Sequence, residues 1–247
     1  MTKRSALRFI NLVLVLVLLL SASGGGLGVA REDVIPVAGM TERVSAASDG
    51  TQGNDHSGIP SITSDGRYVV FSSAASNLVE NDLNGYGDVF IHDRQTGVTS
   101  LVSTASDGTQ GNHDAIYPSV SADGRYIVFQ SYADNLVEGD TNGYDDIFVH
   151  DQETGTTILV SVASDGAQGN SYSFWPLISA DGQHVVFQSD ASNLVSGDLN
   201  GFEDAFVHDL QTGETEIVSI ASDGTQGNKN TGQIAISGDG RYVAFSS

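Results

Sequence analysis

The chain has 247 residues, of which 39% are hydrophobic and 17% are charged, and it contains no cysteine. This apolar fraction is enough to form a core, which excludes a wholly disordered protein. The absence of cysteine excludes a disulfide scaffold, a zinc–cysteine site and a thiol nucleophile. Ten Lys and Arg against 31 Asp and Glu give a net charge of −21. A chain this acidic repels phosphate backbones, so we expect no nucleic-acid partner.

The N-terminal segment has the pattern of a secretory signal peptide. Lys3, Arg4 and Arg8 precede an apolar run at 9–20, and small residues follow as far as Ala30. This order is typical of a cleaved signal, and a helix of this length reaches only about 18 Å, short of the ~30 Å hydrocarbon core of a bilayer. An uncleaved signal anchor is the alternative. We predict a signal peptide at 1–30, a short linker at 31–40, a secreted, periplasmic or cell-envelope location, and no stable membrane span after cleavage.

The rest of the chain, residues 41–247, is one unit repeated at intervals of 58 residues. The sequence SDGTQGN begins at Ser48, Ser106 and Ser222, and at Ser164 with Ala167 in place of Thr. The same interval separates Pro60, Pro118 and Pro176, and no insertion interrupts it. Such regular repetition indicates copies of one supersecondary unit.

Each repeat contains four segments typical of β-strands, which in the first copy are 59–63, 67–73, 89–93 and 98–104. Asp65-Gly66 between the first two predicts a tight hairpin. Runs such as 126–129 are apolar on both faces, as strands covered from both sides require. Four antiparallel strands of this kind predict a β-propeller blade. The phased aromatic residues Tyr68, Phe71, Tyr126, Phe129, Phe187, Tyr242 and Phe245 predict the core between blades.

The repeat resembles a known family. The sequence PSVSADGRYIVF at 118–129, followed by DIFVHD at 146–151, is similar to the TolB-type, WD-repeat-like repeat of bacterial β-propellers, with its theme P-S-x-S-x-D-G-R-x-I-x-F … D-I-x-V-x-D. The resemblance covers about residues 41–247, although this unit is a long-loop variant of a repeat that usually has about forty residues. It implies a propeller fold. It implies no single function, because such propellers serve as binding platforms, accessory domains and enzymes.

The repeat count predicts an all-β, partial propeller. Three full repeats are flanked by partial ones, since residues 41–45 match the fourth strand of a repeat and the fourth copy contains only two strands. We therefore expect four-stranded antiparallel blades in an incomplete ring with an unpaired edge.

The two long loops of each repeat are predicted to lie at one end of the blade, here named the long-loop end. They carry most of the acidic residues, whereas Arg67, Arg94, Arg125 and Arg241 lie near the tight turns at the opposite, short-turn end. Functional loops usually lie on one rim of a rigid scaffold. The sequence therefore predicts a protein or polysaccharide partner at the acidic long-loop end.

One motif, D-x-N-G-[YF]-x-D, recurs in the first long loop of all three full repeats. Calcium prefers several oxygen ligands on a tight loop, so positions 1, 3 and 7, with the backbone carbonyl of position 5, predict a calcium site. The predicted ligands are Asp82, Asn84, Tyr86 and Asp88; Asp140, Asn142, Tyr144 and Asp146; and Asp198, Asn200, Phe202 and Asp204. These loops are similar to the calcium loops of integrin-like propellers and EF-hands. However, only Gly87 matches the EF-hand glycine, and no copy has the EF-hand glutamate.

The motif also has a metal-free interpretation. Asn-Gly forms turns by itself, and Asp or Asn caps a turn through its own backbone. The copies are duplicates of one ancestor, so their recurrence is not independent support. The concentration of carboxylates favours the cation, because like charges repel unless a cation lies among them.

No catalytic centre is predicted. His92, His150 and His208 each precede an aspartate, but no G-x-S-x-G or other nucleophile motif accompanies them, so we interpret them as structural. Trp175, beside Pro176, is interpreted as a packing residue, with a carbohydrate-stacking surface as the alternative.

The sequence thus predicts an exported, non-catalytic β-propeller that acts as a binding or structural module with calcium-stabilised acidic loops. The alternative is the accessory propeller of a larger, peptidase-like hydrolase whose catalytic part is absent from this chain. Sequence beyond Ser247 would distinguish the two: further blades favour the first, and a nucleophile-bearing α/β domain favours the second.

Overall fold

The computed structural model describes residues 41–247, and the predicted signal peptide and linker lie outside them. Glu42–Ser247 form one compact unit. All of the regular elements in this part of the chain are strands, which confirms the all-β prediction. No helix capable of crossing a membrane occurs among the described residues.

The strands form three four-stranded antiparallel sheets and one two-stranded sheet, each paired in chain order. Blade 1 contains β1 (Ser57–Ile62), β2 (Tyr68–Ser73), β3 (Asp88–Asp93) and β4 (Val98–Leu101). Blade 2 contains β5 (Ala115–Val120), β6 (Tyr126–Ser131), β7 (Asp146–Asp151) and β8 (Thr156–Leu159). Blade 3 contains β9 (Ser173–Ile178), β10 (His184–Ser189), β11 (Asp204–Asp209) and β12 (Thr215–Ile217). The partial blade contains β13 (Ile234–Ile236) and β14 (Val243–Phe245).

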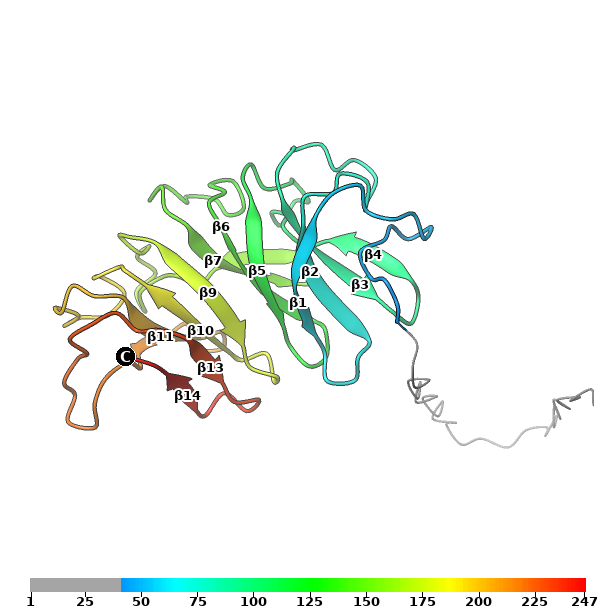
Figure 1. Ribbon diagram of the computed structural model, residues 1–247. Coiled ribbons are helices and arrows are strands. Elements are labelled where there is room, and N and C mark those ends of the chain that lie inside the picture. The colour runs from blue at the N-terminus through cyan, green and yellow to red at the C-terminus, as the bar shows by residue number, and fades with distance from the viewer. Residues whose placement is uncertain (1–40) are drawn as a thin grey trace, which may run out of the picture. The chain divides into compact units, whose positions relative to one another are not determined.

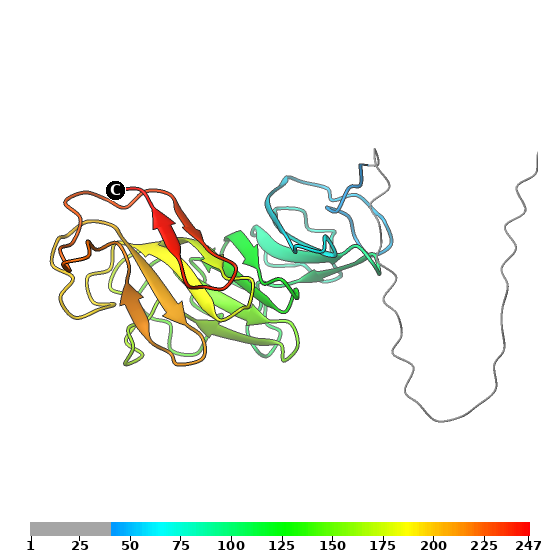
Figure 2. The same ribbon diagram turned by 90° about the horizontal axis from the view of Figure 1, so that it is seen from below.

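The first strand of every blade lies beside that of the next, so β1, β5, β9 and β13 form the inner side of the array (Figure 1). The blades follow one another in chain order, as the colours from cyan to red in Figure 2 show. This is the arrangement of propeller blades, and it confirms the predicted fold class. The prediction that residues 41–45 form the fourth strand of a repeat is wrong, because they are not a strand and only the following residue, Ala46, bridges to Gln52. None of the described sheets includes these residues.

The core consists of apolar side chains between neighbouring blades. One cluster joins Val70 and Val89 of blade 1 to Ile127 and Phe129 of blade 2. Within each full blade a phenylalanine pair stacks, as Phe129 and Phe148 do with ring centroids 5.8 Å apart. The prediction that Tyr242 and Phe245 belong to the core is wrong, because they are 65% and 37% exposed. Their two-stranded sheet has no following blade among the described residues to cover them.

The Asp-Gly turns of blades 2 and 3 each pack on a tyrosine ring of the preceding blade. Gly124 has φ +77°, and a Cβ there would lie 2.3 Å from the Tyr68 ring. Gly182 faces Tyr126 in the same way. The Asp-Gly turn therefore needs glycine both for its left-handed backbone and for the close approach of the next blade.

Candidate functional site

The two kinds of long loop lie together at one end of the blades, as predicted. Gln110, from the loop after β4, accepts a hydrogen bond from the Leu83 N–H at 3.1 Å and donates one to the Asn81 carbonyl at 3.0 Å. Gln168 makes the equivalent pair of bonds in the next blade. The repeated glutamine therefore fixes each D-x-N-G-[YF]-x-D loop to the loop that follows its blade.

The last aspartate of the motif is fully buried. Asp88, Asp146 and Asp204 are each 0% exposed. One carboxylate oxygen of Asp88 accepts from the Ser103 hydroxyl at 2.6 Å, and the other accepts from the Asn84 amide at 2.9 Å. The same serine hydroxyl accepts the N–H of Val89. This network positions the carboxylate and begins the third strand at the aspartate.

The first aspartate of the motif is nearly buried and lacks a cationic partner. Asp82, Asp140 and Asp198 are 9%, 9% and 6% exposed. Asp82 forms no hydrogen bond or ion pair with any described residue. Asp140 and Asp198 receive a long contact, 3.5 and 3.4 Å, from the amides of Gln168 and Gln226, and each also interacts with the backbone N–H of the asparagine two residues later. Neither carboxylate oxygen of Asp82 is among the fully buried polar atoms without a partner, so this carboxylate remains accessible from solution.

Burial changes the protonation of this loop. It raises the pKa of Asp88 and of Asp146 to about 6, against the hydrogen bonds from serine and asparagine that lower it. The charge of Asp82 also raises the pKa of Asp88, so these two carboxyls lie within electrostatic reach of each other. Burial raises the pKa of Asp82, Asp140 and Asp198 as well. Two buried carboxyls that repel each other favour binding of a proton or a metal cation.

Asn84 has two roles in the loop. Its Oδ1 accepts the N–H of Tyr86 at 3.0 Å, which is the turn-capping bond that the metal-free interpretation predicts. Its Nδ2 donates to Asp88 and to the Gly111 carbonyl, 3.1 Å away in the neighbouring loop. Asn142 and Asn200 repeat these contacts with Gly169 and Gly227. Sequence reasoning missed these glycine carbonyls, because a backbone oxygen contributed by another loop leaves no signal in the motif.

The structure thus brings together Asp82, Asn84 and Asp88 of one copy, with equivalent sets in the other two. No group of three or more His, Cys, Asp or Glu side chains able to hold a metal ion occurs within 41–247. Each loop supplies two carboxylates, and its other oxygens come from an amide and from backbone carbonyls. Such an oxygen-only set fits calcium better than zinc or another metal that prefers nitrogen or sulfur.

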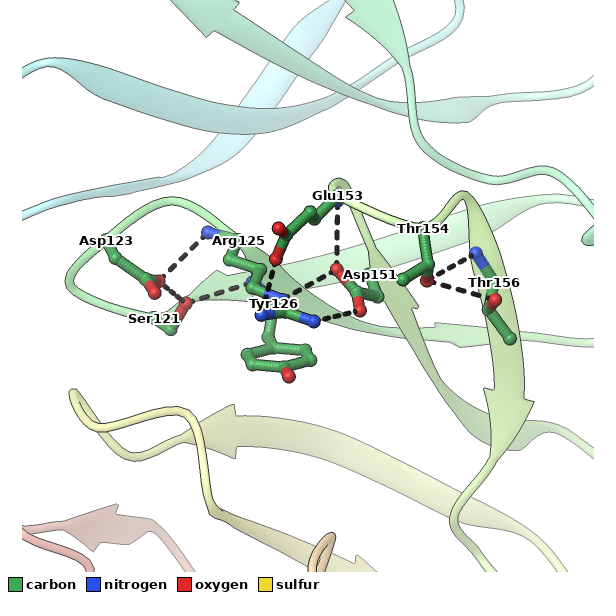
Figure 3. A network of polar contacts seen from close by, with 8 residues as sticks. All are labelled: Ser121, Asp123, Arg125, Tyr126, Asp151, Glu153, Thr154 and Thr156. Carbon is green, nitrogen blue, oxygen red and sulfur yellow. Dashed lines mark hydrogen bonds and ion pairs between the residues drawn. The ribbon is translucent and has the colours of Figure 1, made fainter.

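At the short-turn end, carboxylates are paired. Arg125 donates to both oxygens of Asp151, at 2.9 and 2.8 Å, and also pairs with Glu153 (Figure 3). These bonds lower the pKa of Asp151 to about 2. The Arg125 guanidinium also lies 4.8 Å from the centroid of the Tyr126 ring. Arg67 and Asp93 repeat the ion pair in blade 1, whereas blade 3 has Gln183 in place of the arginine.

The phased histidines are buried within the blades. His92 contacts the Thr99 hydroxyl at 2.8 Å, and His150 and His208 make the same contact in their blades. Burial lowers the pKa of all three. The interpretation of Trp175 as a packing residue is wrong, because its side chain is 47% exposed and lines a cavity.

Comparison with known proteins gives structural matches only. No family model matches the sequence, and the search of curated proteins found no match. Among solved structures, TolB from Acinetobacter baumannii is 18% identical with a TM-score of 0.45, over 77% of this chain and 37% of that one. A putative TolB from Agrobacterium tumefaciens is 19% identical with a TM-score of 0.45, over 78% and 59%. The β-propeller domain of the Trilobed protease from Pyrococcus furiosus is 14% identical with a TM-score of 0.41, over 66% and 42%.

These neighbours are TolB-type and related β-propellers, as the repeat motif predicts. This chain spans less than two thirds of the length of each of them. The assignment of blades follows from the strand pairing within this chain.

Proposed function

We propose that this chain is an exported, non-catalytic β-propeller module that binds a partner or serves a structural role, and that calcium stabilises its acidic loops. The proposal includes a secreted, periplasmic or cell-envelope location, and a protein or polysaccharide partner at the long-loop end. Its non-catalytic character is supported by the near-equivalence of the three full blades, which offers no unique acid, base or nucleophile.

One observation carries the calcium proposal. Asp82 is 9% exposed, has no hydrogen-bond or ion-pair partner in the described chain, and lies within electrostatic reach of the buried Asp88. A divalent cation between these carboxylates would remove their repulsion and satisfy the unpartnered one. The other two loops repeat the same residues, with Asp140 and Asp198 bonded only to neutral groups, so we propose one calcium ion for each full blade.

The residues that would hold the ion in blade 1 are Asp82, Asn84 and Asp88, with backbone carbonyls nearby. The backbone carbonyl of Tyr86 is the fourth ligand that the sequence predicts. The Gly111 carbonyl, which accepts a hydrogen bond from Asn84, is a further oxygen beside the loop. Bound calcium would supply positive charge and oxygen coordination that connect the two long loops. It would hold the long-loop end rigid and leave the remaining acidic side chains available to a partner.

The alternative role, an accessory propeller of a larger hydrolase, requires a catalytic domain elsewhere in a longer protein. No described residue favours that role over the binding module. The calcium proposal holds for both, because it depends only on the loops.

Calorimetric titration of the chelator-treated chain with calcium tests the proposal. We expect a stoichiometry of three, with one site lost in each of the single variants Asp82→Asn, Asp140→Asn and Asp198→Asn. Asp107→Asn is the matched control. This aspartate lies at the same end but is exposed and accepts the Thr109 N–H, so its variant should keep three sites.

A titration without heat or with a stoichiometry unaffected by the three variants would contradict the proposal. The D-x-N-G-[YF]-x-D loop would then be a metal-free turn. Circular dichroism of each variant before titration shows whether a lost site reflects lost folding.

A further inference from the structure

A cavity of about 910 Å³ opens along the inner strands β1, β5, β9 and β13. Its wall is mainly apolar and includes Ile59, Tyr117 and Trp175, each followed by a proline. Amides and serine hydroxyls supply the polar groups, and none of the described lining residues is charged. In a chain of net charge −21, this cavity is therefore a neutral site, unlike the long-loop end.

The fold holds three of these lining residues in an unfavourable backbone conformation. Ile59, Tyr117 and Trp175 have φ of 50°, 54° and 51°, at a β-bulge in each inner strand. Bulky residues rarely adopt a positive φ, and a following proline disfavours helical backbone angles further. A bulge redirects a side chain out of the regular alternation. The repeated bulge thus presents one large side chain per blade to the cavity.

These positions are also where the repeats differ. The copies share nearly all of SDGTQGN, and then diverge over five residues: 55–59, 113–117, 171–175 and 229–233. Over residues 41–73 and their counterparts, four different residues occur at the first, second and fifth positions of this segment and at the position of Ala46, Thr104, Val162 and Ile220. The fifth is Ile59, Tyr117, Trp175 and Gln233, all of which line the cavity. The duplicated blades thus share a scaffold, and among the positions that line the cavity their side chains differ most at this fifth one.

The chemistry of the lining indicates the class of ligand. Trp175 and Tyr117 offer aromatic faces, on which the C–H face of a sugar ring can stack. Gln233 and the lining serines can donate hydrogen bonds to ligand hydroxyls or accept hydrogen bonds from them. A hydroxyl-rich ligand without charge fits all of these groups.

An extended peptide added to the inner strand edges fits less well. The Trp175 N–H already donates to Gln130 of the neighbouring blade at 3.4 Å, and the Ile178 N–H donates to Ser119 at 3.3 Å. The bulges also interrupt the regular ladder that strand addition uses. Recognition in this cavity therefore depends on side chains.

We propose that the cavity binds a neutral oligosaccharide, with a sugar ring stacked on Trp175 and its hydroxyls bonded to Gln233 and to the lining serines. This inference rests on the proposed role as a binding module. It places a ligand away from the acidic loops, since none of the twelve predicted metal ligands lines the cavity.

Trp175 is the single tryptophan of the chain, so its fluorescence reports directly on the cavity. The test is a titration with cellohexaose, maltohexaose, xylohexaose and chitohexaose, in calcium and again in chelator. At least one sugar should change the tryptophan emission in a saturable way. Its affinity in 0.5 M NaCl should stay within about twofold of its affinity without added salt, because neither the ligand nor the site is charged. If calcium does not bind the acidic loops, sugar binding in chelator should be unaffected. A failure of the calcium proposal can therefore be distinguished from a failure of the sugar proposal.

Calorimetry on variants completes the test. Trp175→Ala and Tyr117→Ala should each lower the affinity for the sugar that binds by about tenfold or more. Trp175→Phe should retain part of the affinity. Tyr132→Ala is the control, since Tyr132 is 42% exposed but does not line the cavity. The proposal is overturned if no sugar binds the folded chain, if Trp175→Ala binds as tightly as the parent, or if an uncharged proline-rich peptide saturates the signal and the sugars do not.

Discussion

The two ends of strand β7 hold aspartates in opposite electrostatic states. Asp146, at the long-loop end, is fully buried, and burial raises its pKa to about 6. Asp151, at the short-turn end, accepts two hydrogen bonds from Arg125, which lower its pKa to about 2. The residue type is the same, so the difference lies in the partner. The short-turn end of blade 2 contains its own cation, Arg125, whereas we propose that calcium from solution supplies the cation at the long-loop end.

The largest predicted effect is a difference between the Asp146 and Asp151 variants in how their stability depends on calcium. Asp146→Asn should abolish the stabilisation that calcium gives its loop, about 2.7 kcal/mol at a hundredfold excess over the dissociation constant. Asp151→Asn should lower stability equally in calcium and in chelator, because its cation is Arg125. Thermal unfolding of both variants under both conditions measures this, and equal calcium dependence would remove the contrast between the ends.

The pH dependence of the metal-free chain should show the same contrast. A carboxyl whose folded pKa is raised from 3.8 to about 6 stabilises the folded state below pH 4 and loses that contribution as pH rises through 6. For Asp88 and Asp146 this amounts to about 3 kcal/mol each. Asp93 and Asp151, whose pKa values are lowered by arginine, lose their contribution only as pH falls below 4.

The buried histidines oppose this trend, since their lowered pKa reduces stability as pH falls below 6.5. The double variant Asp88→Asn/Asp146→Asn contains the same histidines and isolates the carboxyls. In chelator, the stability of the parent relative to this variant should decrease between pH 4 and 7. A constant difference over that range would show that neither carboxyl is perturbed.

A smaller effect is expected at two equivalent serines. Ser161 donates to the buried Asp146 and accepts a backbone N–H, and Ser121 does the same for the exposed Asp123. Ser161→Ala should cost about 1–3 kcal/mol in chelator because it leaves a buried acceptor unpaired. Ser121→Ala should cost less, since water can reach its carboxylate. Urea unfolding of the two variants compares them, and equal losses would argue against burial as the cause.

The smallest effect concerns blade 3, whose short-turn end lacks the arginine. Asp209 accepts the backbone N–H groups of Gln211 and Thr212, and the basic side chain beside it in the described chain is His184, at 3.9 Å. Gln183→Arg should recreate the pair seen at Arg125 and Asp151, and should raise stability by about 0.2–1 kcal/mol, as exposed pairs do. The gain should decrease in 1 M salt and should not depend on calcium. A gain that persists in high salt would indicate better packing and not an ion pair.

The regular repeat made most of the fold predictable. Strand order, hairpins and the long-loop end follow from the spacing of Asp65-Gly66, the prolines and the apolar runs, because each blade repeats the same local preferences. Residues 41–45 were predicted wrongly because a strand needs a neighbour to pair with, which the sequence of the segment does not reveal.

The sites were less predictable than the fold. The Gly111 carbonyl contacts Asn84 from another loop. Gln110 holds two loops together through hydrogen bonds to Leu83 and Asn81, which are 27 and 29 residues away in the sequence. The positive φ of Ile59, Tyr117 and Trp175 contradicts local preference, because it is imposed by the bulge and the neighbouring blades. Trp175 was therefore misinterpreted as packing.

The most direct test of the account is thermal unfolding of the chain at pH 7 in excess calcium and in excess chelator, with the triple variant Asp82→Asn/Asp140→Asn/Asp198→Asn beside it. Calcium should raise the midpoint of the parent by several degrees, magnesium should not replace it, and the triple variant should show no rise. A parent midpoint that calcium leaves unchanged, or an equal rise in the triple variant, would contradict the claim that these carboxylates bind calcium.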